Sequence, residues 1–166
     1  MRFFLSSVLV FLLCASARAD TCPARPVSVH GESLLPLVQD GATVMMRPAS
    51  CAGDVRRGDL VVFRNGAHSE PVIKIVKAEP GDSFGVMDDG IIRVNGTPVL
   101  NSTGNSYVLP PSARGVLRAY QCAYQGTVPA ETYLLLGDGA KGVIDSTRIG
   151  LIHSGDFVMV GRYLND

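Results

Sequence analysis

The sequence has 166 residues, a length that suits one domain with a substantial hydrophobic core. Hydrophobic residues make up 46% of it and charged residues 18%, which is typical of a globular chain and excludes a disordered one. The formal net charge is zero and no basic block is present, so the composition argues against nucleic-acid binding.

The first 19 residues have the pattern of a secretory leader. Arg2 supplies a positive charge, the stretch Phe3–Ala15 is apolar apart from two serines, and Ala17-Arg18-Ala19 is a small-x-small cleavage site. The apolar stretch is shorter than the roughly 20 residues of a membrane-spanning helix. We therefore expect export to the periplasm or the outer face of the cytoplasmic membrane. Cleavage after Ala19 would leave residues 20–166 as a single domain; a retained anchor is the alternative.

Short, mostly apolar runs between Gly, Pro, Asn and Asp clusters predict a mainly β fold of antiparallel sheets with few short helices. Seven runs have this pattern: Thr43–Met46, Leu60–Phe63, Val72–Ala78, Phe84–Met87, Ile91–Val94, Tyr133–Leu136 and Phe157–Tyr163. Turn signals at Asp88-Asp89-Gly90 and Asn95-Gly96 predict a β-meander over Phe84–Leu100. No segment after the leader has an amphipathic helical period, and residues 101–130, rich in Ser, Gly, Asn, Pro and Tyr, are predicted to be a loop-rich insertion.

Three cysteines follow the leader, without a Cys-x-x-Cys pair, and the three histidines are scattered. This spacing argues against a zinc site, and we expect neither a metal nor another cofactor. In an oxidising compartment one disulfide and one leftover thiol are expected. The sequence does not fix the pairing among Cys22, Cys51 and Cys122. We favour Cys51–Cys122, because both residues lie in loop-like segments.

Ser33 and Lys74 are the residue types of a Ser-Lys hydrolase. Ser33 lies in a short segment flanked by glycine and proline, and Lys74 is centred in the apolar run Val72–Ala78. Burial disfavours the charged ammonium and lowers its pKa, so a neutral amine could take the proton of a serine hydroxyl. The structural alternatives are a turn serine and a lysine that reaches solvent from a strand edge. Lys77, three residues further on, is the competing lysine.

Several short motifs in order resemble the type I signal peptidase family, which includes the conjugative pilin-maturation peptidases. The matching segments are Ser33-Leu34-Leu35-Pro36, Gly58–Phe63, Ile73-Lys74 followed by Pro80-Gly81-Asp82, Val94-Asn95-Gly96 and, in part, Gly137–Gly150. The resemblance covers nearly all of residues 28–163. It implies a signal-peptidase-like β fold and endopeptidase activity on precursor polypeptides with small residues before the cut.

The resemblance also implies residue roles. Ser33 corresponds to the nucleophile, with its backbone N–H in the oxyanion hole, and Lys74 to the general base. Gly31 occupies the position at which many relatives supply a second oxyanion donor, and Asp145 supports the site. Four residues fall where the family lines its shallow substrate pockets: Leu34, Val38, Val72 and Ile73. The strand of Lys74 is expected to pair with an extended substrate. The apolar run Leu34–Val38 is expected to contact the membrane surface.

Several positions depart from the family pattern. Ile75 replaces the arginine after the lysine, Gly139 replaces asparagine, Val143 replaces the serine that orients the lysine, and Thr147 replaces an arginine. A catalytically silent relative that serves as a binding or assembly module is therefore the alternative function. Two other readings stay open: maturation that joins the new terminus intramolecularly, and a Ser-His-Asp triad of Ser33 with His30 or His153 and Asp145.

Overall fold

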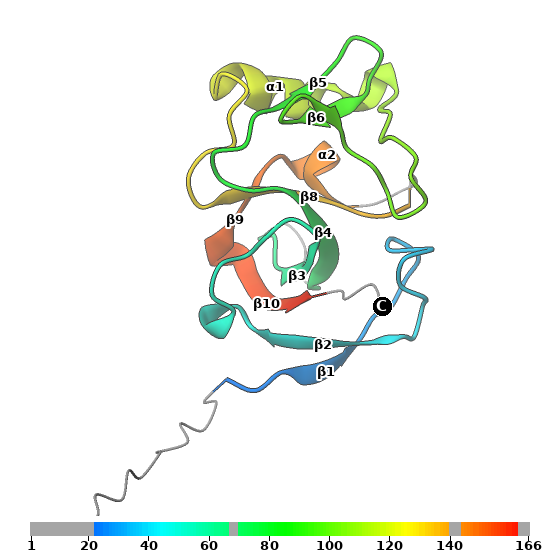
Figure 1. The fold of residues 1–166 in the computed structure, drawn as a ribbon, viewed down its shortest axis with the longest axis vertical. Coiled ribbons are helices and arrows are strands. Elements are labelled where there is room, and N and C mark those ends of the chain that lie inside the picture. Colours follow the sequence, from blue (N-terminus) through cyan, green and yellow to red (C-terminus); the bar gives the residue numbers. More distant parts are fainter. Residues whose placement is uncertain (1–21, 67–69, 140–143, 163–166) are drawn as a thin grey trace, which may run out of the picture.

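The computed structural model describes residues 22–66, 70–139 and 144–162 of the chain. These residues form ten β-strands in two antiparallel sheets, with two short α-helices (Figure 1). The predicted mainly β architecture is confirmed. The expected leader, residues 1–19, lies outside the described residues.

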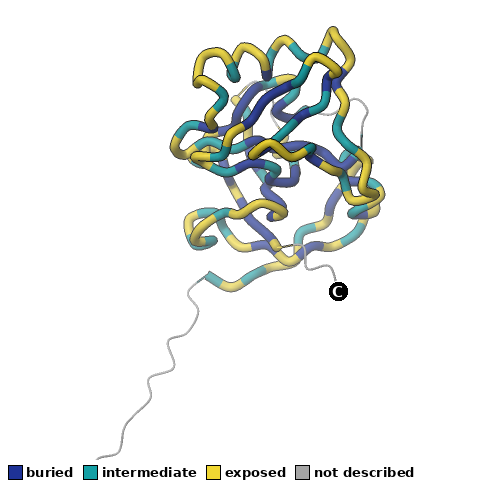
Figure 2. The backbone as a smooth tube through the Cα atoms, turned by 45° about the horizontal axis from the view of Figure 1, so that its top comes forward, coloured by how far each residue is buried: buried dark blue, intermediate teal, exposed yellow. Residues whose placement is uncertain are grey.

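The larger sheet has seven strands in the order β1-β2-β10-β3-β4-β8-β9. Their bounds are β1 Arg25–Ser28, β2 Thr43–Pro48, β3 Asp59–Phe63, β4 Val72–Ala78, β8 Thr132–Leu136, β9 Ile152–His153 and β10 Phe157–Arg162. β3 is apolar on both faces because each face packs on a different cluster of the core: Leu60 and Val62 on one, Val61 and Phe63 on the other. Figure 2 shows the resulting run of buried backbone through the middle of the molecule.

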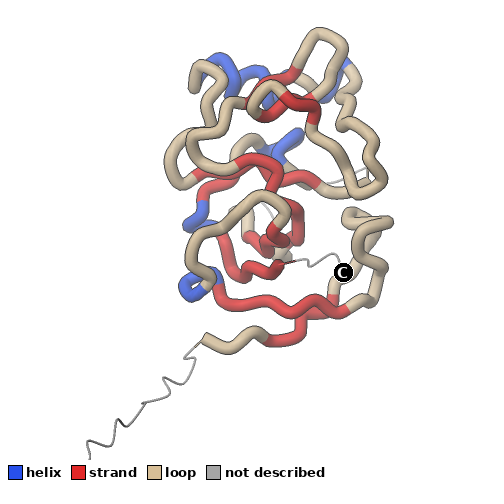
Figure 3. Tube along the Cα trace, viewed as in Figure 1, coloured by secondary structure: helices blue, strands red, loops and turns tan. Residues whose placement is uncertain are grey.

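The smaller sheet has the order β5-β6-β7, with β5 Phe84–Val86, β6 Ile92–Val94 and β7 Thr97–Pro98. It confirms the predicted meander. Asn95 and Gly96, with φ values of 50° and 76°, form the two-residue turn between β6 and β7, because both residues tolerate this conformation. The sheet lies with helix α1 at one end of the molecule (Figures 1 and 3).

The fold has the few short helices that were predicted, but the sequence pattern did not locate them. Helix α1, Gly115–Ala123, lies inside the predicted loop-rich insertion, and α2, Ser146–Ile149, follows a later turn. In α1 the residues Leu117 and Tyr120 face the core cluster of the small sheet, with Ala113 just before the helix. This 3–4 spacing is helical, but it covers little more than two turns. Helix α1 starts with a glycine, which disfavours helices, and no side chain caps it at Arg114. The sequence pattern therefore does not clearly indicate this helix.

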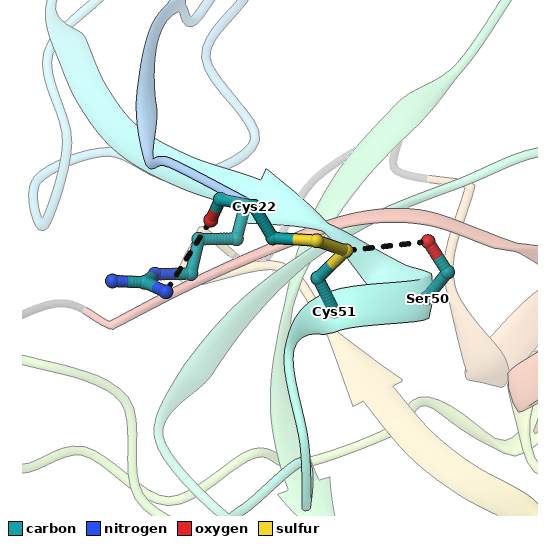
Figure 4. The surroundings of a disulfide bond; sticks show 4 residues. Cys22, Ser50 and Cys51 are labelled. Atoms are coloured by element: carbon teal, nitrogen blue, oxygen red, sulfur yellow. Dashed lines mark hydrogen bonds between the residues drawn. A yellow bond between two sulfur atoms is a disulfide. The ribbon is translucent and has the colours of Figure 1, made fainter. Parts of the chain in front are cut away.

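The predicted disulfide Cys51–Cys122 was wrong. The structure joins Cys22 to Cys51, with their Cα atoms 5.9 Å apart (Figure 4), and leaves Cys122 as a free, exposed thiol. The reason is the register of the sheet. β1 pairs antiparallel with β2, with Arg25 opposite Met46, so the residues before β1 lie beside those after β2. Cys122 is on α1, which packs against β5 and α2 at the other end of the molecule.

Candidate active site

Ser33 lies in the segment 29–42 that connects β1 to β2. Backbone hydrogen bonds close this segment at its base, from Val29 N to Ala42 O and from Gly41 N to Val29 O, each 2.8 Å long. Leu34, the residue after the nucleophile candidate, is 0% exposed and packs in the core cluster that includes Leu60 and Ile75. An apolar anchor directly beside Ser33 therefore fixes the backbone there, while Ser33 itself stays partly accessible.

The carbonyl of Ser33 is also held from the other side. It accepts hydrogen bonds from the N–H groups of Asp138, at 2.8 Å, and Gly139, at 3.3 Å. These two residues directly follow β8 and Gly137. The end of β8 thus sets the orientation of the peptide unit between Ser33 and Leu34.

Lys74 brings its amine to the Ser33 hydroxyl from β4. The distance from Lys74 Nζ to Ser33 Oγ is 2.8 Å, and Nζ also donates to the Ile73 carbonyl at 2.6 Å. The lysine is only 1% exposed. Desolvation by burial lowers its pKa from 10.5 to about 8, against the opposing charge of Asp145, which raises it. A sizeable neutral fraction is therefore available slightly above neutral pH.

Asp145 is a buried carboxylate at the start of α2. One oxygen accepts from the Thr147 N–H, at 2.9 Å, and the Thr147 hydroxyl, at 2.6 Å; the other accepts from the Gly137 N–H at 3.2 Å. Within the described residues, Thr147 is thus the side chain that bonds to Asp145, while the adjacent Arg148 is exposed. Asp145 both caps α2 and ties this turn to the end of β8. Val143, which takes the place of a lysine-orienting serine, lies outside the described residues.

The competing basic residues are engaged elsewhere. Lys77 donates to the Leu100 carbonyl at 2.9 Å and not to Ser33. His153 accepts from the Gly155 N–H through Nδ1, and its Nε2 lies 3.6 Å from Glu131. His30 is 3.9 Å from Asp40, with its side chain 80% exposed. Neither histidine is placed between Ser33 and Asp145, so the geometry does not favour a histidine triad.

The four predicted pocket residues divide between two faces of β4. Leu34, Val38 and Ile73 belong to one packed cluster, but Leu34 and Val38 are almost fully buried, so Ile73 is the more accessible of the three. Val72 packs on the opposite face. Gly31, at φ 95°, donates its N–H to Asp40 at 2.9 Å. The run Leu34–Val38 contributes two core residues, which leaves three partly exposed or exposed members: Leu35, Pro36 and Leu37.

Sequence reasoning did not identify Asp138, Ser102 or Tyr107 as neighbours of the site. Asp138 is 1% exposed and accepts two hydrogen bonds from Ser102, through its N–H and its hydroxyl. Tyr107 donates its hydroxyl to the Gly137 carbonyl at 2.5 Å. The Gly137-Asp138-Gly139 sequence marks the strand end. Ser102, one serine in a loop rich in small polar residues, carries no signal of its own.

Comparison with known families agrees with the fold. The model of the family "Signal peptidase, peptidase S26" matches residues 1–163, and the chain belongs to this family. Membership supports a signal-peptidase-type function, since the family acts on precursor polypeptides at the outer face of the membrane.

Among solved structures, a signal peptidase I of Enterococcus faecalis matches with a TM-score of 0.46 and 19% identity, over 67% of this chain and 97% of its own. No curated protein sequence matches. Within the described residues, no helix has the length and apolar character needed to cross a membrane.

Proposed function

We propose that this protein is a serine endopeptidase in which Ser33 is the nucleophile and Lys74 the general base. The observation that carries the proposal is the 2.8 Å separation of Lys74 Nζ and Ser33 Oγ, with the amine withdrawn from water. A base within hydrogen-bond reach of the hydroxyl has the geometry that proton abstraction needs, and its pKa, lowered to about 8, gives a neutral fraction that grows as the pH rises above neutral.

In this mechanism Ser33 Oγ attacks the substrate carbonyl while neutral Lys74 takes the hydroxyl proton. The lysine then gives that proton to the leaving amine, and water hydrolyses the ester on Ser33. Nothing within the described part of the chain accepts a hydrogen bond from the Ser33 N–H, which supports its assignment as an oxyanion donor. One such donor commonly contributes about 3 kcal/mol to the transition state. Gly31 brings no hydroxyl, and its N–H donates to Asp40, so the expected second donor is not supplied from that position.

The substrate would bind as an added strand beside β4. β8 pairs with β4 only from Ile75 to Ala78. After Leu136 the chain leaves β4, and its next residues bond to the Ser33 carbonyl. The edge at Val72–Lys74 is thus not covered by β8, and it leads directly to the dyad. Main-chain hydrogen bonds at such an edge bind an extended peptide independently of its side chains. We infer precursor polypeptides as substrates from the family, with small residues before the cut as the resemblance implies; Ile73 is the most accessible of the expected pocket residues on this face.

Precursor cleavage by purified variants tests the proposal. Ser33→Ala and Lys74→Ala should each abolish cleavage of an exported precursor, while Ser154→Ala, a partly buried serine in another segment, should leave it unchanged. Retained cleavage in either dyad variant would contradict the mechanism. If the wild-type protein itself leaves every precursor intact and takes up no acylating probe, the silent binding module becomes the better interpretation.

A further inference from the structure

The segment Leu100–Tyr107, between β7 and α1, contacts the part of the chain that holds Ser33. The Ser102 N–H donates to Asp138 Oδ1 at 2.8 Å, and its hydroxyl donates to Asp138 Oδ2. The Tyr107 hydroxyl donates to the neighbouring carbonyl of Gly137 at 2.5 Å. Two residues of one loop, Ser102 and Tyr107, thus hydrogen-bond to the two successive residues that follow β8, Asp138 and Gly137.

Asp138 links this loop to the nucleophile. A carboxylate that is 1% exposed needs donors, and in the described residues both oxygens receive theirs from Ser102. The backbone N–H of the same residue donates to the Ser33 carbonyl at 2.8 Å. Asp138 is thus bonded to Ser102 through its side chain and to Ser33 through its backbone N–H, so a shift of its main chain would lengthen both sets of bonds.

The loop that presents Ser102 is itself fixed. Asn101 Oδ1 accepts from the Thr103 N–H at 3.1 Å and the Asn105 N–H at 2.9 Å, which closes a tight turn. Lys77 Nζ donates to the Leu100 carbonyl at 2.9 Å and lies 5.3 Å from the centre of the Tyr107 ring. Lys77 extends from β4, the strand that also carries Lys74, so the loop and the dyad share one support.

We propose that Ser102 is a positioning residue for the nucleophile, acting through Asp138 to hold the Ser33 backbone in register with Lys74. Only the catalytic consequence of this inference rests on the proposed function; the link from Ser102 through Asp138 to Ser33 does not. Small displacements matter here, because a misplacement of about 1 Å can reduce a rate on the order of 100-fold.

Direct contact between Ser102 and substrate is the competing explanation. A cavity of about 290 Å³ is bordered by Ser102 and Asp138, together with Leu37 and Ile75, so a bound peptide could reach the serine. The two explanations differ in their kinetics. Loss of a substrate contact raises KM, whereas loss of nucleophile positioning lowers kcat and leaves KM unchanged.

The test compares three variants of the full chain. Ser102→Ala removes the hydroxyl, and Ser102→Thr keeps it, with room for the added methyl because Ser102 is exposed. Ser112→Ala is the matched control, an exposed serine of the same insertion whose side chain makes no hydrogen bond within the described residues. We expect Ser102→Ala to lower kcat about tenfold with KM unchanged, and to lower Tm because the buried Asp138 Oδ2 loses its donor. Ser102→Thr should keep both kcat and Tm, and Ser112→Ala should match wild type.

Amide hydrogen exchange of Asp138, followed by NMR, is the second measurement, and it needs no activity. Exchange of this N–H should be at least about tenfold faster in Ser102→Ala than in wild type, and unchanged in Ser112→Ala. Unchanged Asp138 exchange in Ser102→Ala, or a raised KM with kcat intact, would overturn the inference. If wild type neither cleaves precursors nor reacts at Ser33, the proposed function fails, and the exchange result alone then decides whether Ser102 holds Asp138.

Discussion

The amine of Lys74 is buried, and burial disfavours its charged form. The residue is 1% exposed, and its pKa falls from 10.5 to about 8 because burial removes water from the ammonium. The same burial that makes it a usable base therefore destabilises the folded protein whenever the amine is protonated. Reactivity and stability are opposed at this one residue.

Lys74→Met, which removes the amine but keeps an unbranched side chain, should stabilise the protein while abolishing cleavage. The penalty is fully present below pH 8, declines as the pH rises toward 10.5, and is absent above it, because the unfolded chain is then neutral as well. The pKa difference corresponds to roughly 3 kcal/mol, and lost hydrogen bonds offset part of that, so we expect a gain of about 1–3 kcal/mol at pH 7.

Urea unfolding of wild type and Lys74→Met at pH 7 and near pH 10.5 measures this. The stability difference should shrink at the higher pH. If Lys74→Met is less stable than wild type at both pH values, the cost of burying the charged amine does not dominate the effect of this residue on the free energy of unfolding.

Asp145 should control the pH at which the lysine becomes a base. Its negative charge raises the pKa of Lys74, so Asp145→Asn should lower that pKa and move the rise of kcat/KM to lower pH. The asparagine can still accept from Thr147 and cap α2. The measurement is a pH profile of precursor cleavage, with Asp156→Asn, an exposed carboxylate of another turn, as the control. A profile that stays in place in a folded Asp145→Asn protein would exclude this electrostatic role.

At the scale of single residues, the sequence allowed part of the candidate site to be predicted. Ser33 and Lys74 stood out because their residue types and flanking patterns are informative, and the structure places the two side chains 2.8 Å apart. Ser102 and Tyr107 could not be found in this way. Their contacts to Asp138 and Gly137 depend on how a loop folds back over a distant strand end, which no local pattern encodes.

At the scale of elements, the disulfide constrains the segment that carries Ser33. Ser33 lies between Cys22 and Cys51 in the chain, and β1, which leads into its segment, has one strand neighbour, β2, in the sheet. The Arg47 side chain adds a hydrogen bond to the Cys22 carbonyl at 3.3 Å (Figure 4). The cross-link therefore holds an edge strand that would otherwise depend mainly on its ladder to β2.

Breaking this cross-link should lower stability without changing the fold. Closing a loop of this size contributes typically about 2–4 kcal/mol, so Cys51→Ser should lower the free energy of unfolding by that amount. Cys122→Ser, which alters only the exposed free thiol, should have little effect. Chemical denaturation of both variants, with and without a reductant, is the measurement. Equal loss in the two variants, or no loss in Cys51→Ser, would contradict this role.

The strands were more predictable than the helices for a physical reason. Runs such as Leu60–Phe63 and Val72–Ala78 are mostly apolar, and turn residues such as Asn95-Gly96 mark the ends of other strands. Helix α1 gives a weaker signal, since Leu117 is its one fully buried residue and no side chain caps its start. β1 and β9 are short and partly exposed, so their pairing depends on neighbours rather than on their own pattern.

At the scale of the whole molecule, the candidate site lies where three separate segments meet. The β1–β2 connection supplies Ser33, β4 supplies Lys74, and the end of β8 supplies the N–H groups that hold the Ser33 carbonyl. The larger sheet brings β4 and β8 together, while the smaller sheet and α1 pack against its end (Figure 1). The order of strands in the sheet, which sequence pattern alone does not reveal, is what made the disulfide prediction wrong.

The most direct test of the dyad is the rate at which a β-lactam-type acylating probe modifies Ser33, measured by mass spectrometry across a range of pH. With a neutral Lys74 as the base, the rate should rise through a midpoint near pH 8, and Ser33→Ala should take up no probe. A rate that is flat from pH 6 to pH 10, or no adduct on Ser33 in folded wild-type protein, would contradict the mechanism.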